Sequence, residues 1–262
     1  MLALLFTASS SALAMGMPMG PPSIEQLQQK VAAELEAMDQ DVALAAQQLS
    51  FSGLHGEGTA GILQRLHDEH TSVVDAATVD LDGRLVLIRP EKYAASEGSS
   101  IADQDHFLRL RGAGEPVMSE LFETVEGFHA VSIGYPVFSP QGEPIGYISL
   151  VFQPDALVRN IVEPLDYKTF QLEALAIQTN GRIVYDKDIM QVGRMTFSDP
   201  AYQDYPSLLE LAARAVEQES GSGVYEYPAS PEGEPVKKEA QWATVGLHGT
   251  EWRLILSKHA AE

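Results

Sequence analysis

One hairpin motif occurs twice in this chain, about 100 residues apart, and this duplication constrains the fold more than any other feature. Gly-Arg-Leu-Val-Leu begins at Gly83 after Asp82, and Gly-Arg-Ile-Val-Tyr begins at Gly181 after Asn180. Asp-Gly and Asn-Gly between alternating apolar runs are strong signals of a two-residue hairpin turn. The sequence therefore predicts two antiparallel strand pairs, 73–79 with 84–88 and 172–179 with 182–185.

A second hairpin follows the first one in each half of the chain, after an irregular segment that contains a short helix. The predicted helices cover 104–111 and 207–219. The predicted strands are 129–138 with 143–152, and 236–245 with 251–257. Hairpins build antiparallel sheets, and helices then cover the sheet faces. We therefore predict an α+β fold with two tandem modules, each an antiparallel sheet flanked by helices.

A long helix is predicted before the first module, because the sequence from Ser23 to about Ser50 contains no Gly or Pro. Its apolar residues are spaced alternately by four and three positions, as on one face of a helix, and Ser23 is a good N-cap. Those residues are Leu27, Val31, Leu35, Met38, Val42, Ala45 and Leu49. A coiled-coil arm and a spine that carries a distal module are both consistent with this pattern. A shorter helix is expected over 59–71.

The first 14 residues carry no charge and end in Ala12-x-Ala14, the small-x-small pattern that signal peptidase cuts. A basic segment is missing and the apolar part is short. Residues 1–20 are therefore predicted to be either a signal peptide whose start lies upstream or a truncated membrane anchor. Both alternatives place the protein outside the cytoplasm. No later segment reaches the roughly 20 apolar residues that a membrane helix needs.

The chain is strongly acidic, with 17 Lys+Arg against 37 Asp+Glu and a net charge of −20. Such a surface repels nucleic-acid phosphates and anionic lipids, which argues against nucleic acid as a partner. The absence of cysteine excludes disulfides, thiolate nucleophiles and thiolate metal sites.

The usual catalytic motifs, G-x-S-x-G, HExxH and a phosphate-binding Gly/Lys loop, are missing from the sequence. We predict no enzyme activity and no cofactor, with a hydrolase as the least favoured alternative. His67 and His70 have a spacing that can hold a metal, but a solvated helix face is the favoured interpretation, and no metal site is predicted. Asp186 and Asp188 are interpreted as turn acids, and Tyr202 and Tyr205 as packing or turn residues.

The order and spacing of several short motifs resemble the double Cache family of extracytoplasmic sensor domains, which have a PAS-like fold. Residues 100–107 (SIADQDHF) resemble the family's D-x-x-Y-F entry to the pocket helix, and 115–119 its following strand. The segments 135–138 and 142–148 resemble its last hairpin, and 178–186, 192–194 and 197–200 its second module. The ending, 244–252, is also similar to that of stand-alone Cache proteins. The resemblance covers about 23–259.

The resemblance implies a small-molecule receptor that signals through a separate partner. It divides the chain into the N-terminal segment 1–20, the long helix 23–55, a membrane-distal module 56–160 and a membrane-proximal module 161–260. The pocket is expected in the distal module, and a small polar, carboxylate-bearing ligand is predicted. A secreted binding or interaction protein without switching is the alternative. Other partners that stay open are a transporter and a second copy joined through the long helix.

One subgroup of this family binds amino acids with an Arg and aromatics after the D-x-x motif, a strand Tyr and an Asp on the last strand. Here residues 104–107 read QDHF, Phe122 stands near the strand Tyr, and Val151 stands at the Asp position. A free α-amino group would lose a charge-assisted hydrogen bond without that carboxylate. These departures argue against an amino-acid ligand.

The first candidate site residues lie on and near the predicted pocket helix. His106 could donate a hydrogen bond to a carboxylate or carbonyl ligand, and Phe107 could form an apolar wall. A cap residue and a core aromatic are the alternative interpretations. Arg109 could clamp a carboxylate, although a surface charge is the favoured interpretation. Phe122 is a candidate by its position near the strand Tyr.

The other candidates lie on the strands of the second hairpin. Alternation places His129 and Tyr135 on one face of their strand and Ser132 on the other. On the last strand, Ser149 and Gln153 share the face on which the amino-acid subgroup places its Asp. The sequence leaves open which face carries the pocket.

Overall fold

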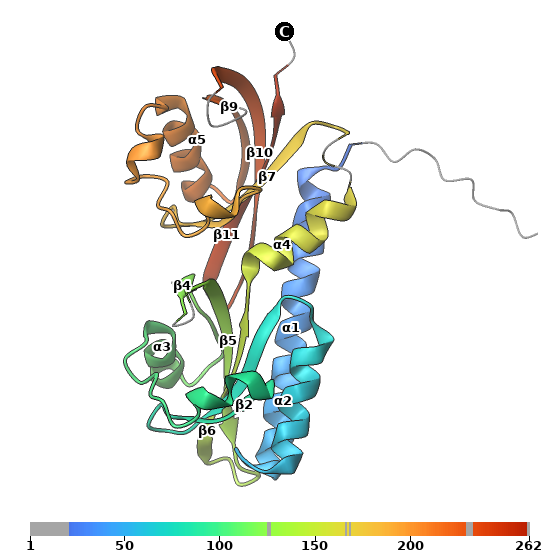
Figure 1. Ribbon diagram of the computed structural model, residues 1–262, viewed down its shortest axis with the longest axis vertical. Helices are drawn as coiled ribbons and strands as arrows, with labels where there is room; N and C mark the ends of the chain where they lie inside the picture. Colours follow the sequence, from blue (N-terminus) through green and yellow to red (C-terminus); the bar gives the residue numbers. More distant parts are fainter. Residues whose placement is uncertain (1–20, 125–126, 166, 168, 229–232, 261–262) are drawn as a thin grey trace, which may run out of the picture.

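The computed structural model describes residues 21–124, 127–165, 167, 169–228 and 233–260. The predicted signal peptide or anchor, 1–20, lies outside the described residues. Two antiparallel sheets are stacked end to end along one long helix, α1 (Ile24–Ser52), as Figure 1 shows. This arrangement confirms the predicted α+β fold with a long N-terminal helix and two tandem modules.

The long helix forms where the apolar stripe predicts it. Ser23 caps its N-terminus: the Ser23 hydroxyl accepts from the Gln26 amide, and the Gln26 side chain accepts from the Ser23 amide. Gly53 ends the helix with a φ of 77°. The predicted stripe is buried along its whole length against both sheets.

The first module begins with helix α2 (Glu57–Glu69), which packs beside α1. The sheet order is β2-β1-β6-β5-β3, and the short strand β4 pairs with β5. The strands are β1 (Val73–Val79), β2 (Leu85–Arg89), β3 (Val117–Met118), β4 (Phe122–Glu123), β5 (His129–Phe138) and β6 (Pro144–Phe152). Between β2 and β3 lie the 3₁₀ helix η1 (Glu91–Ser96) and helix α3 (Asp105–Ala113).

The second module repeats this plan with the strand order β8-β7-β11-β10-β9. The strands are β7 (Leu172–Gln178), β8 (Ile183–Tyr185), β9 (Ser220–Pro228), β10 (Pro235–Leu247) and β11 (Thr250–His259). The helical elements are α5 (Pro206–Glu217), η3 (Ile189–Gln191) and η4 (Pro200–Tyr202). Helix α4 (Pro154–Val162) and the 3₁₀ helix η2 (Glu163–Leu165) connect the two sheets, and α4 lies across the predicted boundary at residue 160.

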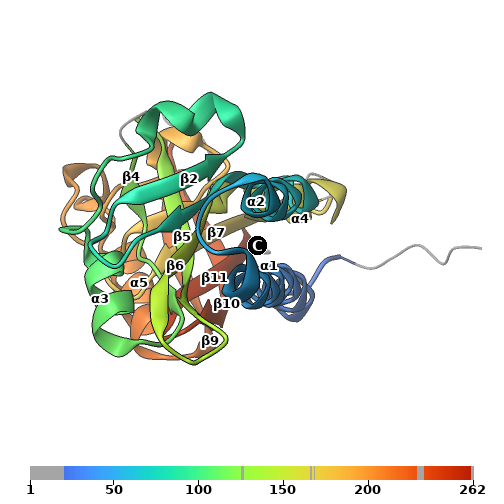
Figure 2. The ribbon, with the colours of Figure 1, turned by 90° about the horizontal axis from the view of Figure 1, so that it is seen from below.

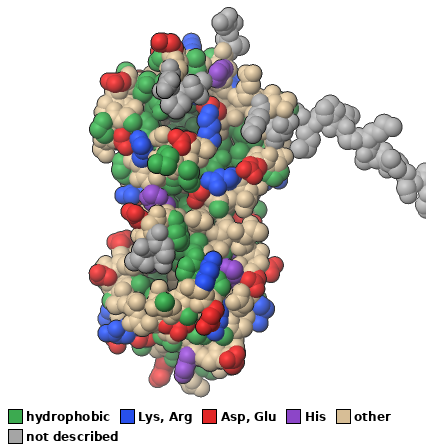
Figure 3. Space-filling model, in the orientation of Figure 1, with side chains coloured by type: hydrophobic (Ala, Val, Ile, Leu, Met, Phe, Trp, Pro, Cys, Tyr) green, Lys and Arg blue, Asp and Glu red, His purple; other side chains and the backbone are tan. Residues whose placement is uncertain are grey.

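Each sheet is covered on both faces, but by different layers. Helices α1, α2 and α4 lie on one side of the sheets, and α3 and α5 lie on the other, as seen from below in Figure 2. The core on the α1 side is continuous from the first module into the second and includes Ile133 and Leu150 of one sheet with Val245 and Leu254 of the other. Separate apolar clusters lie under α3 and under α5. Acidic side chains are distributed over both modules (Figure 3).

Candidate functional site

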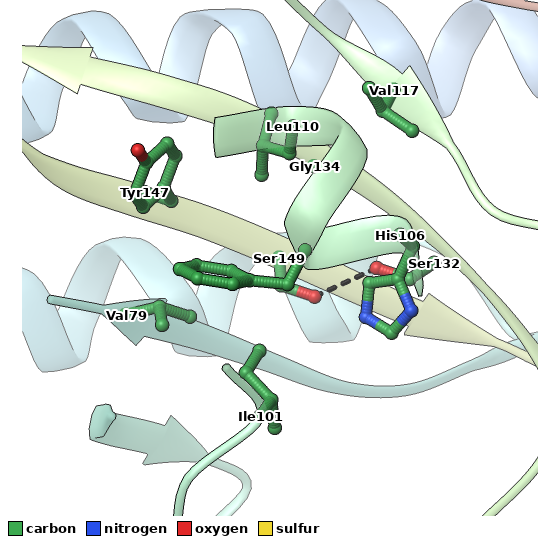
Figure 4. A pocket seen from close by; sticks show the side chains of 10 residues that line it. Val79, Ile101, His106, Leu110, Val117, Ser132, Gly134, Tyr147 and Ser149 are labelled. Atoms are coloured by element: carbon green, nitrogen blue, oxygen red, sulfur yellow. Dashed lines mark hydrogen bonds between the residues drawn. The ribbon is translucent and has the colours of Figure 1, made fainter. Parts of the chain in front are cut away.

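A small cavity lies in the first module between helix α3 and the sheet face opposite α1 (Figure 4). It encloses about 10 Å³, which is space for roughly one water molecule. Its polar lining residues are His106, Ser132 and Ser149. The apolar part of the lining comes from Val79, Ile101, Phe107, Leu110, Val117, Gly134 and Tyr147.

Strand register explains why these residues share one face. Gly134 pairs with Ser149, and Ser132 pairs with Val151, so the side chains of these paired positions point to the same side of the sheet. A Cβ at Gly134 would lie 2.8 Å from Leu110 Cδ2, so a larger residue there would displace the Leu110 side chain. The missing side chain lets α3 approach the sheet closely and keeps the cavity small.

The serine pair forms the polar floor of the cavity. The hydroxyls of Ser132 and Ser149 are hydrogen-bonded at 2.8 Å (Figure 4), and both residues are buried. The Ser132 amide also donates to the Ser119 hydroxyl at 2.9 Å. Two buried hydroxyls that are hydrogen-bonded to each other can exchange this hydrogen bond for hydrogen bonds to a ligand.

His106 forms the polar wall opposite the serines. Its ring stacks on Phe122, with the centroids 5.2 Å apart. Burial lowers the pKa of His106 to about 4, and Arg109 lowers it further while Asp105 opposes the shift. The imidazole is therefore neutral near pH 7, with one nitrogen that donates and one that accepts.

The structure brings four of the predicted residues together at this cavity: His106, Phe107, Ser132 and Ser149. Phe122 lies behind His106 as its stacking partner. Arg109 is half-buried on α3 and acts electrostatically on His106 and Glu120. Gln153 occupies the N-cap of α4, where its backbone amide donates to the Ser72 carbonyl at 2.9 Å.

His129 and Tyr135 are placed outside the cavity, on the other face of β5, because strand alternation turns them toward α1 and the second module. The Tyr135 hydroxyl donates to Asp39 of α1 at 2.7 Å. The His129 ring lies against Gly193 of the second module, where a Cβ would collide with it. This resolves the face that the sequence left open: the cavity lies on the side of Ser132.

The contacts that join the two modules were not predicted from the sequence. The buried Thr250 hydroxyl donates to the Met118 carbonyl at 2.7 Å, and the Gln178 side-chain amide donates to the Glu120 carboxylate. His248 Nε2 lies 2.6 Å from the same Asp39 oxygen that Tyr135 contacts. The residues of these pairs are 58 to 209 positions apart in the sequence, so local patterns give no signal of them.

Within the part of the chain that the structure describes, no cluster of three or more His, Asp or Glu side chains could hold a metal ion. His70 instead faces two carboxylates of α1, with Nδ1 at 3.1 Å from Glu34 and Nε2 at 3.0 Å from Asp41. His67 contacts Asp68 at 2.8 Å. Among the described helices, none is long and apolar enough to cross a bilayer.

Comparisons with known proteins agree with this fold. The HK/GC/chemotaxis protein-like sensor-domain family matches residues 33–154. The chain is also similar to an extracellular ligand-binding receptor from Desulfohalobium retbaense, with 31% sequence identity and a TM-score of 0.76. That match covers 90% of this chain and 39% of the receptor chain, so this chain corresponds to less than half of the receptor's length.

Two chemoreceptor domains share the fold at lower identity. The ligand-binding domain of the amino acid chemoreceptor PctB from Pseudomonas aeruginosa, in complex with L-Gln, has 18% identity and a TM-score of 0.64, covering 90% of this chain and 88% of that one. The domain of the chemoreceptor CtaA from Pseudomonas fluorescens, in complex with L-isoleucine, has 15% identity and a TM-score of 0.64, with the same coverage of 90% and 88%. Among curated proteins, no match was found.

Proposed function

Because the chain belongs to the double Cache family of sensor domains, we propose that its first module binds a small polar molecule that carries a carboxylate. The protein then acts outside the cytoplasm and passes the signal to a separate partner. The observation that carries this proposal is the cavity under α3, where a neutral imidazole and two hydroxyls converge on one apolar enclosure.

The cavity lining favours a carboxylate over an α-amino acid. It contains no Asp or Glu among the described residues, so an ammonium group would find no charged partner there. A carboxylate can accept hydrogen bonds from Ser132 and Ser149, and it can stabilise a proton on His106. The nearby Arg109 charge, which acts on His106, favours an anion there.

The small volume of the cavity makes ligand binding and conformational change inseparable. A space of about 10 Å³ cannot hold an organic acid, so α3 and the His106–Phe122 stack must move outward before the ligand fits. A ligand that fits only the open state shifts the population toward it. The continuous core along α1 provides a physical route from the first module to the second.

The proposal is tested by thermal-shift titration of the full chain with lactate and pyruvate, and with lactamide as the uncharged counterpart of lactate. The two acids should raise Tm and lactamide should not. His106→Ala should abolish the acid-dependent shift, whereas His67→Ala on the polar face of α2 should preserve it. A shift that persists in His106→Ala would exclude His106 as the anchor, and a response to lactamide alone would exclude the carboxylate.

Proton uptake gives a second test that does not depend on a variant. A carboxylate beside His106 raises the pKa of the imidazole from about 4, so binding takes up a proton. Affinity should therefore increase as the pH is lowered from 8 toward 6. Titration calorimetry in two buffers of different ionisation enthalpy measures this uptake directly, and identical enthalpies in both buffers would contradict the role of His106.

A further inference from the structure

The second module contains a much larger cavity on the corresponding face of its sheet, beneath the start of α5. Its volume is about 330 Å³, within the range of about 300 to 1,000 Å³ that small-molecule sites occupy. Strands β7, β9, β10 and β11 form its floor, and the segment that follows β8 forms its side. This cavity is separate from the one under α3.

Four tyrosines from three segments line this cavity. Tyr202 and Tyr205 come from η4 and the start of α5, and Tyr225 and Tyr227 come from β9. Two hydroxyls are held in place: Tyr202 donates to Gln191 at 2.5 Å and Tyr225 donates to Ser257 at 3.2 Å. The rings of Tyr205 and Tyr227 meet edge to face, with centroids 4.8 Å apart. The tyrosines therefore form a fixed aromatic wall.

The side chain of Lys238 already makes a cation–π contact with this aromatic wall. The Lys238 ammonium lies 5.9 Å from the centroid of the Tyr227 ring, and its side chain is 2% exposed. Glu173 neutralises this ammonium and also pairs with Lys187, each at 2.5 Å. The two lysines of the lining are thus both engaged by a single carboxylate.

Two carboxylates of the lining, Asp186 and Asp188, are outside the Glu173 ion pairs, and Asp186 is the half-buried one of the two. Asp186 forms no ion pair among the described residues. One of its oxygens accepts from the Asp188 amide at 2.8 Å. Burial raises the pKa of Asp186 to about 6, although the Asp188 amide and the Lys187 charge act in the opposite direction.

We propose that this cavity is a second ligand site, which binds a small organic ammonium ion between Asp186 and the tyrosine wall. Aromatic rings attract cations, above all alkylated ammonium groups, and a desolvated carboxylate supplies the matching charge. The three carboxylates and two lysines of the lining leave one unbalanced negative charge, which an ammonium ligand neutralises. The first and second modules then recognise ligands of opposite charge.

The test is titration calorimetry of the full chain with choline and with butylamine at pH 7.5. Two analogues of choline isolate the charge: 3,3-dimethylbutan-1-ol is neutral and 3,3-dimethylbutyrate is anionic. At least one ammonium probe should bind saturably, and each analogue should bind at least about tenfold more weakly. Absence of saturable binding by both ammonium probes, or equal binding of the neutral analogue, would overturn the proposal, as would preferential binding of the anion.

Two variants and a matched control assign the contacts. Asp186→Asn keeps the acceptor for the Asp188 amide but removes the charge, and it should weaken ammonium binding about tenfold or more. Tyr205→Leu should weaken it about threefold to tenfold. Asp82→Asn, in the exposed turn of the first hairpin, should leave binding unchanged. Unaltered affinity in Asp186→Asn would overturn the site.

A pH titration of the unmodified chain with choline is independent of whether the variants fold. Choline keeps its charge at every pH, and only the ionised form of Asp186 attracts it. With a pKa of about 6, the carboxylate is mostly protonated at pH 5, so affinity should be about tenfold lower there than at pH 7.5. An affinity that is constant over this range, or that rises toward pH 5, would overturn the proposal.

Discussion

The two modules have the same strand order, yet their corresponding cavities differ in volume and chemistry. In the first module, Phe107 and Leu110 of α3 reach the sheet and leave about 10 Å³ around neutral polar groups. In the second module, the apolar side of α5 packs over Trp242, and the rest of that face stays open as about 330 Å³ lined by charges and tyrosines. The backbone plan provides the position of a cavity, and the covering helix determines its size.

The largest predicted effect tests whether the first cavity is closed by packing. Phe107 is 1% exposed and meets Tyr147 edge to face. Phe107→Ala should lower the free energy of unfolding by about 3 to 5 kcal/mol. Tyr205→Ala, on the open wall of the second cavity, should cost only about 1 kcal/mol. Urea denaturation measures both, and equal losses would remove the contrast between a packed and an open cavity.

The pH dependence of stability should have opposite signs in the two cavities. The pKa of His106 is lowered to about 4, so the unfolded chain binds more protons below pH 6.5 and stability is lost as the pH falls toward 4. The pKa of Asp186 is raised to about 6, so the folded chain binds more protons and stability is gained as the pH falls from 6 toward 4.

These two contributions are each about 2 kcal/mol between pH 7 and 4.5, and they oppose each other in the unmodified chain. Single variants separate them. His106→Gln should make the protein more acid-resistant, and Asp186→Asn should make it less so. Denaturation curves at pH 7 and 4.5 give the answer, and a common direction for both variants would contradict the assigned shifts.

A smaller effect concerns the contact between the modules. Thr250→Val keeps the shape of the side chain but leaves the buried Met118 carbonyl without its donor. The expected loss is about 1 to 2 kcal/mol, which corresponds to a fall in Tm of roughly 2 to 6 °C for a chain of this length. Calorimetry should show one transition at lower temperature. An unchanged Tm would mean that this bond does not support the interface.

The smallest predicted effects compare hydroxyls in the two cavities. Ser132→Ala breaks the bond to the buried Ser149 hydroxyl and should cost about 1 kcal/mol. Tyr227→Phe removes a hydroxyl that has no hydrogen-bond partner among the described residues, so stability should change by less than about 0.5 kcal/mol. Urea denaturation curves of the two variants, recorded under the same conditions, test this difference. A larger loss of stability in Tyr227→Phe than in Ser132→Ala would contradict the description of the first cavity as closed and the second as open.

The hairpins were predictable from sequence because each depends on local turn chemistry. Gly83 and Gly181 have φ angles of 83° and 85°, which glycine adopts without the steric cost that a Cβ imposes. The helix stripe was equally local, since its spacing alone shows which face is buried. The elements found in this way end within a few residues of their predicted bounds.

Strand β9 was not predicted because its first two inward positions are Gly221 and Gly223, which carry no side chains. A Cβ at Gly221 would collide with the indole of Trp242, and one at Gly223 would collide with the Arg214 guanidinium. Large side chains from neighbouring elements fill the space that strand residues usually fill themselves. The result is a Gly/Ser-rich sequence that has the composition of a loop. Helix α4 was also missed.

The first cavity was only partly predictable, and the second was not predicted at all. Alternation grouped Ser132 apart from Tyr135, but only the register with β6 and the position of α3 identify the cavity face. In the second module, Asp186 does act as a turn acid, accepting from the Asp188 amide. Its desolvation, and the approach of tyrosines from β9 and η4, are tertiary effects without a local sequence signature.

The uninterrupted apolar stripe of α1 limits how such proteins can be recombined. A graft of residues 56–160 onto another receptor would separate the first sheet from α1, because Val31 and Met38 share one core with both sheets. A chimaera that preserves folding must exchange the helix together with the sheet it covers. Otherwise, the new sheet must carry side chains that pack against the apolar stripe of α1 as the original ones do. Substitution of single residues on α3 therefore disturbs this shared core less than exchange of a whole module does.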